Sequence, residues 1–460
     1  MNFGSFVFLL IFLPISVIAY FFIDKLNKPL IKNIFIFIIS AVFYCWVGIK
    51  FFVFIFALAS INYLLVILMK HEKYRKTLMI SAVVIDVGFL VFFKYLNFLC
   101  SIVSIQNDFI ASIAAPLGVS FIVFHLITYI VDVYRKDAPI DYNFLNLLVY
   151  VFFFPKVIVG PITPYKDMIG QIEDRHTSLD DLTSGIKFFI LGLAQKVFIA
   201  DILLPLVSES FGNSAIIATW IAWVGLITYT IQIYIDFVAY TNMAIGLAKV
   251  FGFSLPENFN YPYLATSITD FWRRWHITLG AWFRNYVYIP LGGNRKGKFR
   301  TYLNLFIIFL LTGIWHGAAW QFIIWGLLHG AFMLIERAFL GKYLKKIPKV
   351  FSVLYTLFIV MLGWVLFNSK DLPSALQYYA ALFNFNSSGE AYAYVLPQFD
   401  AFYFIALALG ILCCFPLLRY VPSKIKDNKI ITSVLAFIAL AACIVYLSAA
   451  SFNPFIYYLF

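Results

Sequence analysis

Long runs of apolar residues, separated by short polar segments, recur along the whole chain. Each run is long enough, or nearly long enough, to cross the roughly 30 Å hydrocarbon core of a bilayer as a helix. The runs lie at 3–23, 33–49, 51–69, 77–96, 115–134, 145–160, 185–206, 215–248, 301–315, 319–338, 350–367, 401–419 and 430–449. Because the shorter runs are expected to be re-entrant or tilted, we expect about eleven spanning helices. The pattern predicts an all-α polytopic membrane protein. With no polar linker or repeat to divide the chain, we expect one domain over residues 1–460.

The composition supports a membrane protein. Hydrophobic residues make up 63% of the chain and charged residues 12%, and the mean hydropathy is +0.90. A soluble protein cannot wet that much apolar surface. The first run has no basic segment before it and no small-residue cleavage site after it. We therefore interpret 3–23 as an uncleaved first span rather than a signal peptide.

The formal charge of +12 comes from basic residues in short blocks between the apolar runs. This distribution is typical of the cytoplasmic loops of membrane proteins and does not favour nucleic-acid binding. The blocks are Lys25, Lys28 and Lys32; Lys70, Lys73, Arg75 and Lys76; Arg337, Lys342, Lys345, Lys346 and Lys349; and Arg419, Lys424, Lys426 and Lys429. Placing all four inside, and the more acidic loop 368–400 outside, predicts that both termini lie outside.

The five cysteines all lie in or beside apolar runs, without a CxxC pair or a histidine at metal-ligand spacing. They are Cys45, Cys100, Cys413, Cys414 and Cys443. We interpret them as small core residues and expect no metal site.

Residues 269–300, TDFWRRWHITLGAWFRNYVYIPLGGNRKGKFR, are aromatic and basic at once. A period of 3.6 residues predicts an amphipathic helix, with Asp270 at its start and His276 within it. Its apolar face carries Phe271, Trp275, Leu279, Trp282 and Phe283, and Arg273, Arg274 and Arg284 lie elsewhere. Composition alone is typical of a membrane-surface helix followed by a cytoplasmic basic loop. His276 favours a functional role.

The segment GIWHGAAW, residues 313–320, joins two apolar runs and holds His316. A helix over 301–314 is about 21 Å long, shorter than the hydrocarbon core, so we expect the turn at His316 to lie at membrane depth. Non-helical backbone at that depth must be packed in protein or line a cavity. A buried histidine is often a core residue, but an ionisable group at membrane depth indicates a functional site.

At these residues the sequence resembles the membrane-bound O-acyltransferase (MBOAT) superfamily. The likeness is to the bacterial branch that includes the membrane subunits of alginate and peptidoglycan O-acetylation. It covers most of the chain after residue 150, with a signature core at about 150–340. The matching stretches are VGPITPY (159–165), GLAQKVFIAD (192–201), YIDFVAYTNMAIG (234–246), DFWRRWHITLGAWFRNYVYIPLGGNRKG (270–297) and GIWHGAAWQFIIWGLLHG (313–330).

The resemblance implies a helical fold with a central tunnel in the bacterial inner membrane, and acetyl-coenzyme A as a donor from the cytoplasm. On this pattern His316 matches the family's catalytic histidine and His276 the second histidine of its signature. Lys156 departs from the pattern, since a neutral polar residue is commoner there. It either pairs with a neighbouring acid or alters the choice of donor or acceptor.

The chemistry of O-acylation fits these residues. A hydroxyl needs a base, and a neutral imidazole suits that role, which we assign to His316. Indole N–H groups of Trp315 or Trp320 are candidates to stabilise the oxyanion. Arg273, Arg274, Arg295 and Lys296 are candidates to hold the phosphates of coenzyme A, and topology alone explains them equally well.

The C-terminal segment NPFIYYLF, residues 453–460, ends in aromatic residues, which suits a simple interfacial anchor. It also resembles a C-terminal Phe-x-Tyr motif of envelope acylation systems, in which a tyrosine is thought to carry the acyl group. Tyr457 matches that tyrosine, and Tyr458 is the less favoured alternative. A phenol, with an ordinary pKa near 10, is a better leaving group than an alcohol, so an aryl ester can pass its acyl group onward.

The acceptor and the partner follow less directly. The chain has no GxSxG nucleophile elbow and no appended soluble domain, so we expect an extracytoplasmic esterase-like O-acetyltransferase partner. Peptidoglycan, alginate or another exopolysaccharide, and teichoic acid are candidate acceptors. The Lys-, Ile- and Phe-rich composition indicates an AT-biased genome and slightly favours peptidoglycan. Two other classes stay open, a non-catalytic scaffold and a secondary transporter or flippase that uses buried charges. Candidates for such charges are Asp86, Lys94, Asp132, Lys156, Asp201 and Asp236.

Overall fold

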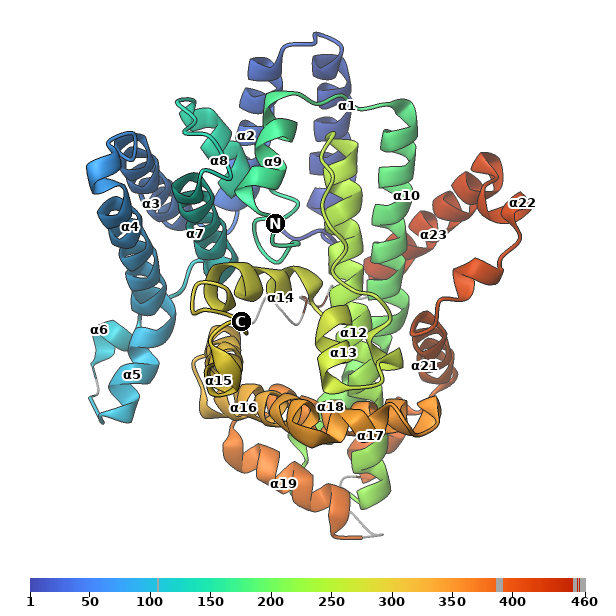
Figure 1. Ribbon diagram of the computed structural model, residues 1–460. Helices are drawn as coiled ribbons and strands as arrows, with labels where there is room; N and C mark the ends of the chain where they lie inside the picture. Colours follow the sequence, from blue (N-terminus) through green and yellow to red (C-terminus); the bar gives the residue numbers. More distant parts are fainter. Residues whose placement is uncertain (106, 386–391, 450–452, 454, 456–460) are drawn as a thin grey trace. The chain divides into compact units, whose positions relative to one another are not determined.

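The computed structural model describes residues 1–105, 107–385, 392–449, 453 and 455, and every regular element in these ranges is helical (Figure 1). By their contacts they form two compact units. Unit 1 comprises 1–190 and 241–256, and unit 2 comprises 191–240 and 257–460. Two of the three boundaries fall inside helices, α10 (Leu179–Gln195) and α12 (Thr219–Val250), and the third lies in the non-helical segment after α12. The single domain over 1–460 stays a prediction.

Unit 1 is a set of apolar helices in which α2 packs against α8, α3 against α4, and α7 against α4 and α9. It also holds the start of α10 and the end of α12. Its other elements are η1 (Val7–Phe12), α1 (Leu13–Asp24), α2 (Pro29–Cys45), α3 (Ile49–Leu68), η2 (Glu72–Tyr74), α4 (Arg75–Leu90), η3 (Val91–Tyr95), α5 (Leu96–Ile102), α6 (Asp108–Ala111), α7 (Val119–Arg135), α8 (Phe144–Phe152) and α9 (Tyr165–Glu173).

A buried polar network ties the first two helices of unit 1 to the segment after α9. Lys32 forms an ion pair with Asp24 at 2.7 Å and donates to the Arg175 carbonyl oxygen at 2.7 Å. Arg175 in turn donates to the Asn33 side-chain oxygen at 2.7 Å. The assignment of Lys32 to the first basic loop is therefore wrong. It lies inside α2 and is buried because Asp24 neutralises its charge.

Unit 2 contains the end of α10, most of α12 and the elements that follow. In it α16 packs against both α15 and α18, and α13 lies against α16 and α18. The elements are η4 (Lys196–Ala200), α11 (Asp201–Gly212), η5 (Pro262–Leu264), α13 (Ile268–Arg274), α14 (Ile277–Phe283), η6 (Arg284–Tyr288), α15 (Gly297–His316), α16 (Trp320–Ile335), η7 (Glu336–Leu340), α17 (Gly341–Leu344), α18 (Lys349–Asn368), α19 (Leu372–Phe383), α20 (Tyr392–Val395), η8 (Leu396–Gln398), α21 (Ala401–Cys413), η9 (Leu417–Tyr420), α22 (Ser423–Lys426) and α23 (Lys429–Ala449).

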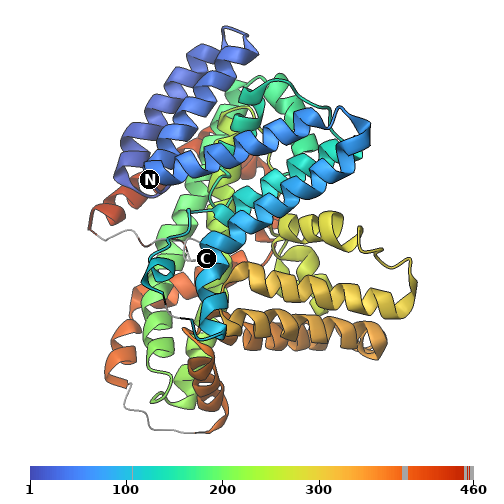
Figure 2. The same ribbon diagram turned by 90° about the vertical axis from the view of Figure 1, so that its left-hand side faces the viewer.

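The helices α15 and α16 form a tight hairpin, seen side by side in Figures 1 and 2. Two glycines allow the close approach. A Cβ added at Gly313 would lie 2.5 Å from the Phe322 carbonyl oxygen, and one at Gly326 would lie 2.3 Å from that of Phe309. Small residues at a helix crossing let membrane helices pack backbone to backbone. This crossing sets the position of His316, which lies three residues after Gly313.

The helices confirm a polytopic membrane protein. Among the described residues, nine helices are long and apolar enough to span a bilayer, and Pro29–Cys45 and Ala401–Cys413 are shorter apolar helices. One expected run differs. Within 145–160 only α8 is helical, and turns that hold Lys156 follow it.

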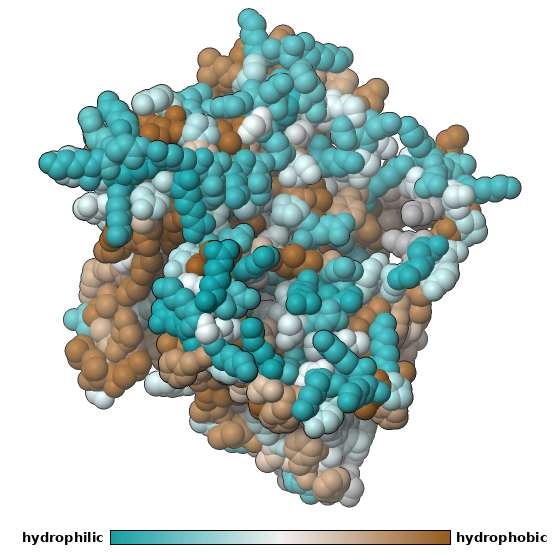
Figure 3. Space-filling model, viewed as in Figure 1, coloured by the Kyte–Doolittle hydropathy of each residue, from teal (hydrophilic) through white to brown (hydrophobic). Residues whose placement is uncertain are grey.

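The outer surface of unit 1 suits contact with lipid. Figure 3 shows hydrophobic side chains gathered over the lower part of α4 and over α5. Large apolar residues are exposed there, including Val84, Phe92, Leu99 and Ile102. Exposed apolar surface of this extent is unfavourable in water, so its natural surroundings are acyl chains.

Candidate active site

The segment that holds His276 is not one helix. It breaks into α13 and α14 at Trp275 and His276, and His276 adopts a left-handed backbone conformation with φ 45°. The expectation of a continuous amphipathic helix through His276 is therefore wrong. The reason is Asn258, whose carbonyl oxygen accepts from Ile277 N at 2.9 Å and whose side-chain oxygen accepts from Thr278 N at 3.1 Å. These bonds satisfy backbone N–H groups in the first turn of α14, so a new helix begins there.

The same asparagine fixes the tautomer of His276. The atom that accepts from the Thr278 backbone N–H must be the Asn258 amide oxygen. That oxygen lies 3.1 Å from His276 Nδ1, so Nδ1 carries the proton and donates. The Nε2 atom of the neutral ring is then a proton acceptor. Burial lowers the pKa of His276 to about 3, which keeps the imidazole neutral at ordinary pH.

The helix start of α13 is built by local capping. The Ser267 side chain accepts from Asp270 N, and Asp270 accepts from Thr266 N at 3.2 Å, as in a capping box. Glu336 of η7 adds a second cap, because its carboxylate accepts from Ile268 N at 2.6 Å and from Thr269 N at 3.0 Å. A buried carboxylate at a helix N-terminus is favourable. These bonds hold α13 against α16 and η7.

His316 is the last residue of α15 rather than part of a turn. The expectation of a short helix is wrong, because α15 begins at Gly297 and its 20 residues give about 30 Å of length. The basic residues Lys298 and Arg300 belong to the helix, not to a preceding loop. His316 is nevertheless 1% exposed, and the non-helical residues 317–319 follow it.

Aromatic rings surround His316. Its ring centroid lies 4.9 Å from that of Trp315, 4.8 Å from Trp325 and 5.2 Å from Phe367. Trp315 also contacts His276, with centroids 6.2 Å apart. The structure therefore places both predicted histidines in contact with one indole, that of Trp315. Trp320 starts α16 and is 53% exposed, unlike Trp315.

Sequence reasoning assigned no role to His329 and Trp325, which lie in the same buried layer. The Trp325 ring contacts both His316 and His329, at 4.8 and 5.2 Å. His329 is fully buried in α16, and neither of its ring nitrogens has a hydrogen-bond partner among the described residues. The spacing of Trp325 and His329, four residues apart on one helix, was the available signal.

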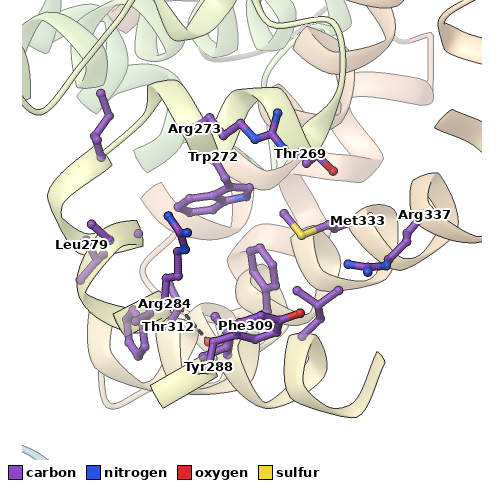
Figure 4. A pocket seen from close by; sticks show the side chains of 16 residues that line it. Thr269, Trp272, Arg273, Leu279, Arg284, Tyr288, Phe309, Thr312, Met333 and Arg337 are labelled. Carbon is purple, nitrogen blue, oxygen red and sulfur yellow. Dashed lines mark hydrogen bonds between the residues drawn. The ribbon is translucent and has the colours of Figure 1, made fainter. Parts of the chain in front are cut away.

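An open pocket of about 610 Å³ lies beside this layer, and its lining comes from α13–η6 and from α15, α16 and η7 (Figure 4). Its lining includes the large apolar side chains of Trp272, Phe309 and Met333. Three exposed guanidinium groups, of Arg273, Arg284 and Arg337, reach it from different sides. Among the described residues none of these arginines forms an ion pair. A pocket of this volume, apolar below and cationic at its rim, fits a ligand with an apolar arm and phosphate groups.

Of the four predicted phosphate-binding residues, one lines this pocket and three lie outside its lining. Arg273 lines the pocket, whereas Arg274 pairs with Asp270 at 3.0 Å. Arg295 and Lys296 are exposed in the turns before α15, outside the pocket lining. Arg284 and Arg337 were missed as ligand groups. Arg284 stands in the same aromatic-basic stretch, and Arg337 was read only as a topology signal.

Two successive rings, those of Trp272 and Trp325, connect the pocket to His316. Trp272 lines the pocket, and its ring contacts that of Trp325 at 5.7 Å. Trp325 in turn contacts His316. On α15, Thr312 lines the pocket one helical turn before His316. The pocket and the buried base therefore belong to one arrangement of α13, α15 and α16.

The remaining candidate residues lie apart from this arrangement. Tyr457, with Tyr458, falls outside the described residues. Lys156 in unit 1 is buried with its ammonium 4.0 Å from the centre of the Tyr150 ring, and no acidic partner is present among the described residues. Asp201 and Asp236, which a transporter reading would use, both form ion pairs with Lys196.

Comparison with known proteins agrees with the resemblance. A family model for MBOAT, the membrane-bound O-acyltransferase family, matches residues 133–369. The chain belongs to this family. A probable alginate O-acetylase AlgI of Azotobacter vinelandii is 36% identical to this MBOAT protein over 504 aligned positions, covering 100% of both chains. The peptidoglycan O-acetyltransferase of Helicobacter pylori is 34% identical over 82% of this chain and 78% of its own.

A more distant relative has another named activity. The teichoic acid D-alanyltransferase of Bacillus subtilis is 28% identical over 55% of this chain and 69% of its own. Together the family match and the full-length relatives show that this multi-pass MBOAT protein is an O-acyltransferase. The transporter and scaffold readings are set aside.

Proposed function

We propose that the protein takes an acetyl group from acetyl-coenzyme A in the cytoplasm and delivers it across the inner membrane for O-acetylation of a cell-envelope polysaccharide. The observation that carries this proposal is the buried His276–Trp315–His316 row beside an arginine-rimmed pocket. An imidazole in dry, aromatic surroundings suits proton transfer to and from oxygen and sulfur.

The pocket is the proposed donor site. Arg273, Arg284 and Arg337 would hold the phosphates of coenzyme A, and Trp272 and Phe309 would pack along its apolar arm. Arg337 belongs to a basic block that the positive-inside rule assigns to the cytoplasm. Cytoplasmic acyl-coenzyme A would therefore meet the arginines first. Of the phosphate-binding residues expected from the sequence, we therefore retain Arg273. We propose Arg284 and Arg337 in place of Arg274, Arg295 and Lys296.

The proposed transfer is an ordinary acyl exchange. A hydroxyl oxygen attacks the thioester carbonyl carbon while His316 takes the hydroxyl proton. The carbon–sulfur bond then breaks as the carbonyl re-forms, and the sulfur receives the proton from the imidazolium. The products are an O-acetyl ester and the thiol of coenzyme A. His276, which burial keeps neutral and whose tautomer Asn258 fixes, is the second proposed proton acceptor.

Tyr457 is the proposed first acceptor. Its phenol would carry the acetyl group as an aryl ester and pass it to an extracytoplasmic esterase-like transferase, which would acetylate the polymer. Extracytoplasmic termini are required for this route. The names of the relatives point to alginate and to peptidoglycan as acceptors, and the relative that aligns over its full length is the alginate one. The slight preference for peptidoglycan stays a prediction.

The test is reconstitution in liposomes with radiolabelled acetyl-coenzyme A, comparing wild type with His316→Ala and Tyr457→Phe. We expect label on the wild-type protein and release of the thiol, both lost in His316→Ala. Loss of protein label in Tyr457→Phe, with tryptic label on 453–460 in wild type, supports the carrier. Label elsewhere on the protein would discard the tyrosine and keep the base. No turnover in the presence of a partner transferase and polymer would sink the acetyl-coenzyme A donor.

A further inference from the structure

Three charged side chains are buried together where η4 meets α11 and α12. Lys196 Nζ lies 2.8 Å from Asp201 Oδ1 and 2.7 Å from Asp236 Oδ1. None of the three residues is more than 7% exposed. The sequence stretches at 192–201 and 234–246 thus meet in one ion cluster, which the acyl-transfer route does not use. Two carboxylates share a single ammonium, so each of the three buried charges is close to an opposite charge.

The end of the chain covers one side of this cluster. Lys196 Nζ lies 4.7 Å from the centre of the Phe455 ring, and Phe455 is 1% exposed. The Tyr240 ring meets the Phe455 ring edge-on at 5.0 Å. The Asn453 side chain lies near the Asp201 carboxyl group. Within the C-terminal segment, Phe455 is therefore held by its ring, and Asn453 lies beside the same cluster.

The burial of Phe455 is not a by-product of the helix that precedes it. In α23 only 11% of the most apolar window is buried, and Phe437 of that helix is 72% exposed. A helix that mostly faces outward does not by itself bury a phenylalanine that lies six residues after its end. Phe455 is buried because the cluster and Tyr240 provide a seat for it. An ammonium over a desolvated aromatic face is a favourable and specific contact.

The seat shares a turn of α12 with the histidine site. Asp236 and Tyr240 are four residues apart and lie on one face of the helix. Phe237, next to Asp236, contacts His276 with ring centroids 4.9 Å apart. One turn of α12 therefore supports both the seat of the C-terminal segment and the ring packed on His276.

We propose that Lys196, Asp201, Asp236 and Tyr240 form a docking site for the protein's own C-terminal segment, with Phe455 as the anchor and Lys196 as the positioning residue. Its role in acyl transfer rests on the function proposed above. A residue two positions beyond Phe455 has its Cα within about 7 Å of the Phe455 Cα. Docking of Phe455 would therefore limit how far the carrier residue two positions later can move from the seat, and so favour repeated acceptance and delivery of its acyl group.

Docking is tested without reference to activity by thiol labelling. A cysteine is introduced as Leu459→Cys in the full-length protein, with the five native cysteines replaced by serine or alanine, and a polar maleimide reports how often the segment is released. Phe455→Ala removes the aromatic ring and its contact with Lys196, and it should speed labelling of the introduced cysteine at least about tenfold. Phe455→Leu keeps the apolar volume but loses the cation–π contact and should speed it about fivefold. Phe455→Trp should label like wild type.

The control is Phe437→Ala, which removes a phenylalanine of the same region that faces outward. Equal labelling of wild type and Phe455→Ala, or an equal rise in Phe437→Ala, would overturn the docking site. Wild-type labelling in Phe455→Leu would overturn Lys196 as the positioning residue. Size-exclusion profiles in detergent identify any variant that fails to fold. If Phe455→Ala fails to fold, the comparison of Phe455→Trp with Phe455→Leu still tests the docking site.

Activity separates this inference from the function on which it rests. If Phe455→Ala releases the segment and also lowers acetyl label on Tyr457, docking positions the carrier. If Phe455→Ala releases the segment and acetyl transfer stays at the wild-type rate, the positioning role is overturned while acyl transfer stands. If wild type shows no transfer but the labelling order holds, the proposed function fails and the docking site stands.

Discussion

Two buried regions of unit 2 offset the free-energy cost of burying ionisable side chains in opposite ways. The His276–Trp315–His316 row is lined by rings, and the neutral side chain of Asn258 is fixed against the His276 imidazole. The Lys196 cluster holds one ammonium and two carboxylates within 2.8 Å. The first region keeps groups that can gain and lose a proton, and the second keeps charges that neutralise one another. Chemistry is therefore expected to depend on the first region and stability on the second.

The sharpest way to separate the two regions is His316→Gln. Glutamine fills a similar volume and accepts no proton, so we expect acyl transfer to fall about 10³- to 10⁴-fold, the upper part of what a general base contributes. The free energy of unfolding should change much less than in the lysine cluster, because glutamine fills a similar volume and leaves no charge unpaired. Steady-state release of coenzyme A and detergent unfolding curves measure the two quantities. Unfolded protein with His316→Gln would break the comparison.

The converse change is Lys196→Met, which leaves two carboxylates buried without their cation. Breaking a buried ion pair by removing one partner costs about 3–5 kcal/mol of stability. Combining Lys196→Met with Asp201→Asn and Asp236→Asn removes every charge and should recover most of that loss. Unfolding midpoints in detergent measure both effects. A stable Lys196→Met protein would mean that the cluster has a role other than mutual neutralisation.

The pocket gives a third, smaller test. Arg284→Gln and Arg337→Gln should each raise KM for acetyl-coenzyme A about tenfold, the usual effect of losing one hydrogen bond to a charged group. The matched control is Arg274→Gln, whose guanidinium is engaged with Asp270 instead of facing the pocket. Its KM should stay at the wild-type value. Equal effects for all three arginines would place the phosphates elsewhere, for example at Arg295 and Lys296.

The sequence predicted the helical class and most apolar segments, because periodicity and hydropathy are local properties of the chain. It singled out His276 and His316 separately, and their common contact with Trp315 appears only in the structure. It could not predict the break at His276, which depends on Asn258, 18 residues upstream. It also misplaced the start of α15. Residues 298–300 look like a loop by charge, yet lysine and arginine are good helix formers and extend the helix. The burial of Lys32 with Asp24 likewise needed the tertiary contact to be seen.

The smallest effect concerns the pH dependence of stability and isolates His276. In the unfolded chain an imidazole takes up a proton as the pH falls through about 6.5, whereas burial lowers the pKa of folded His276 to about 3. Between these values the unfolded state binds more protons, so the unfolding free energy falls as the pH falls, by up to about 1.4 kcal/mol per pH unit.

This contribution is absent above about pH 6.5, where the imidazole is neutral in both states. His276→Gln should therefore flatten the stability curve between pH 6 and about 4. Unfolding midpoints at fixed detergent concentration across that range measure the slope. An unchanged slope in His276→Gln would mean that this imidazole takes up its proton in the folded protein. His276 would then not be a neutral group, and the contrast between the neutral histidine row and the lysine cluster would not hold for it.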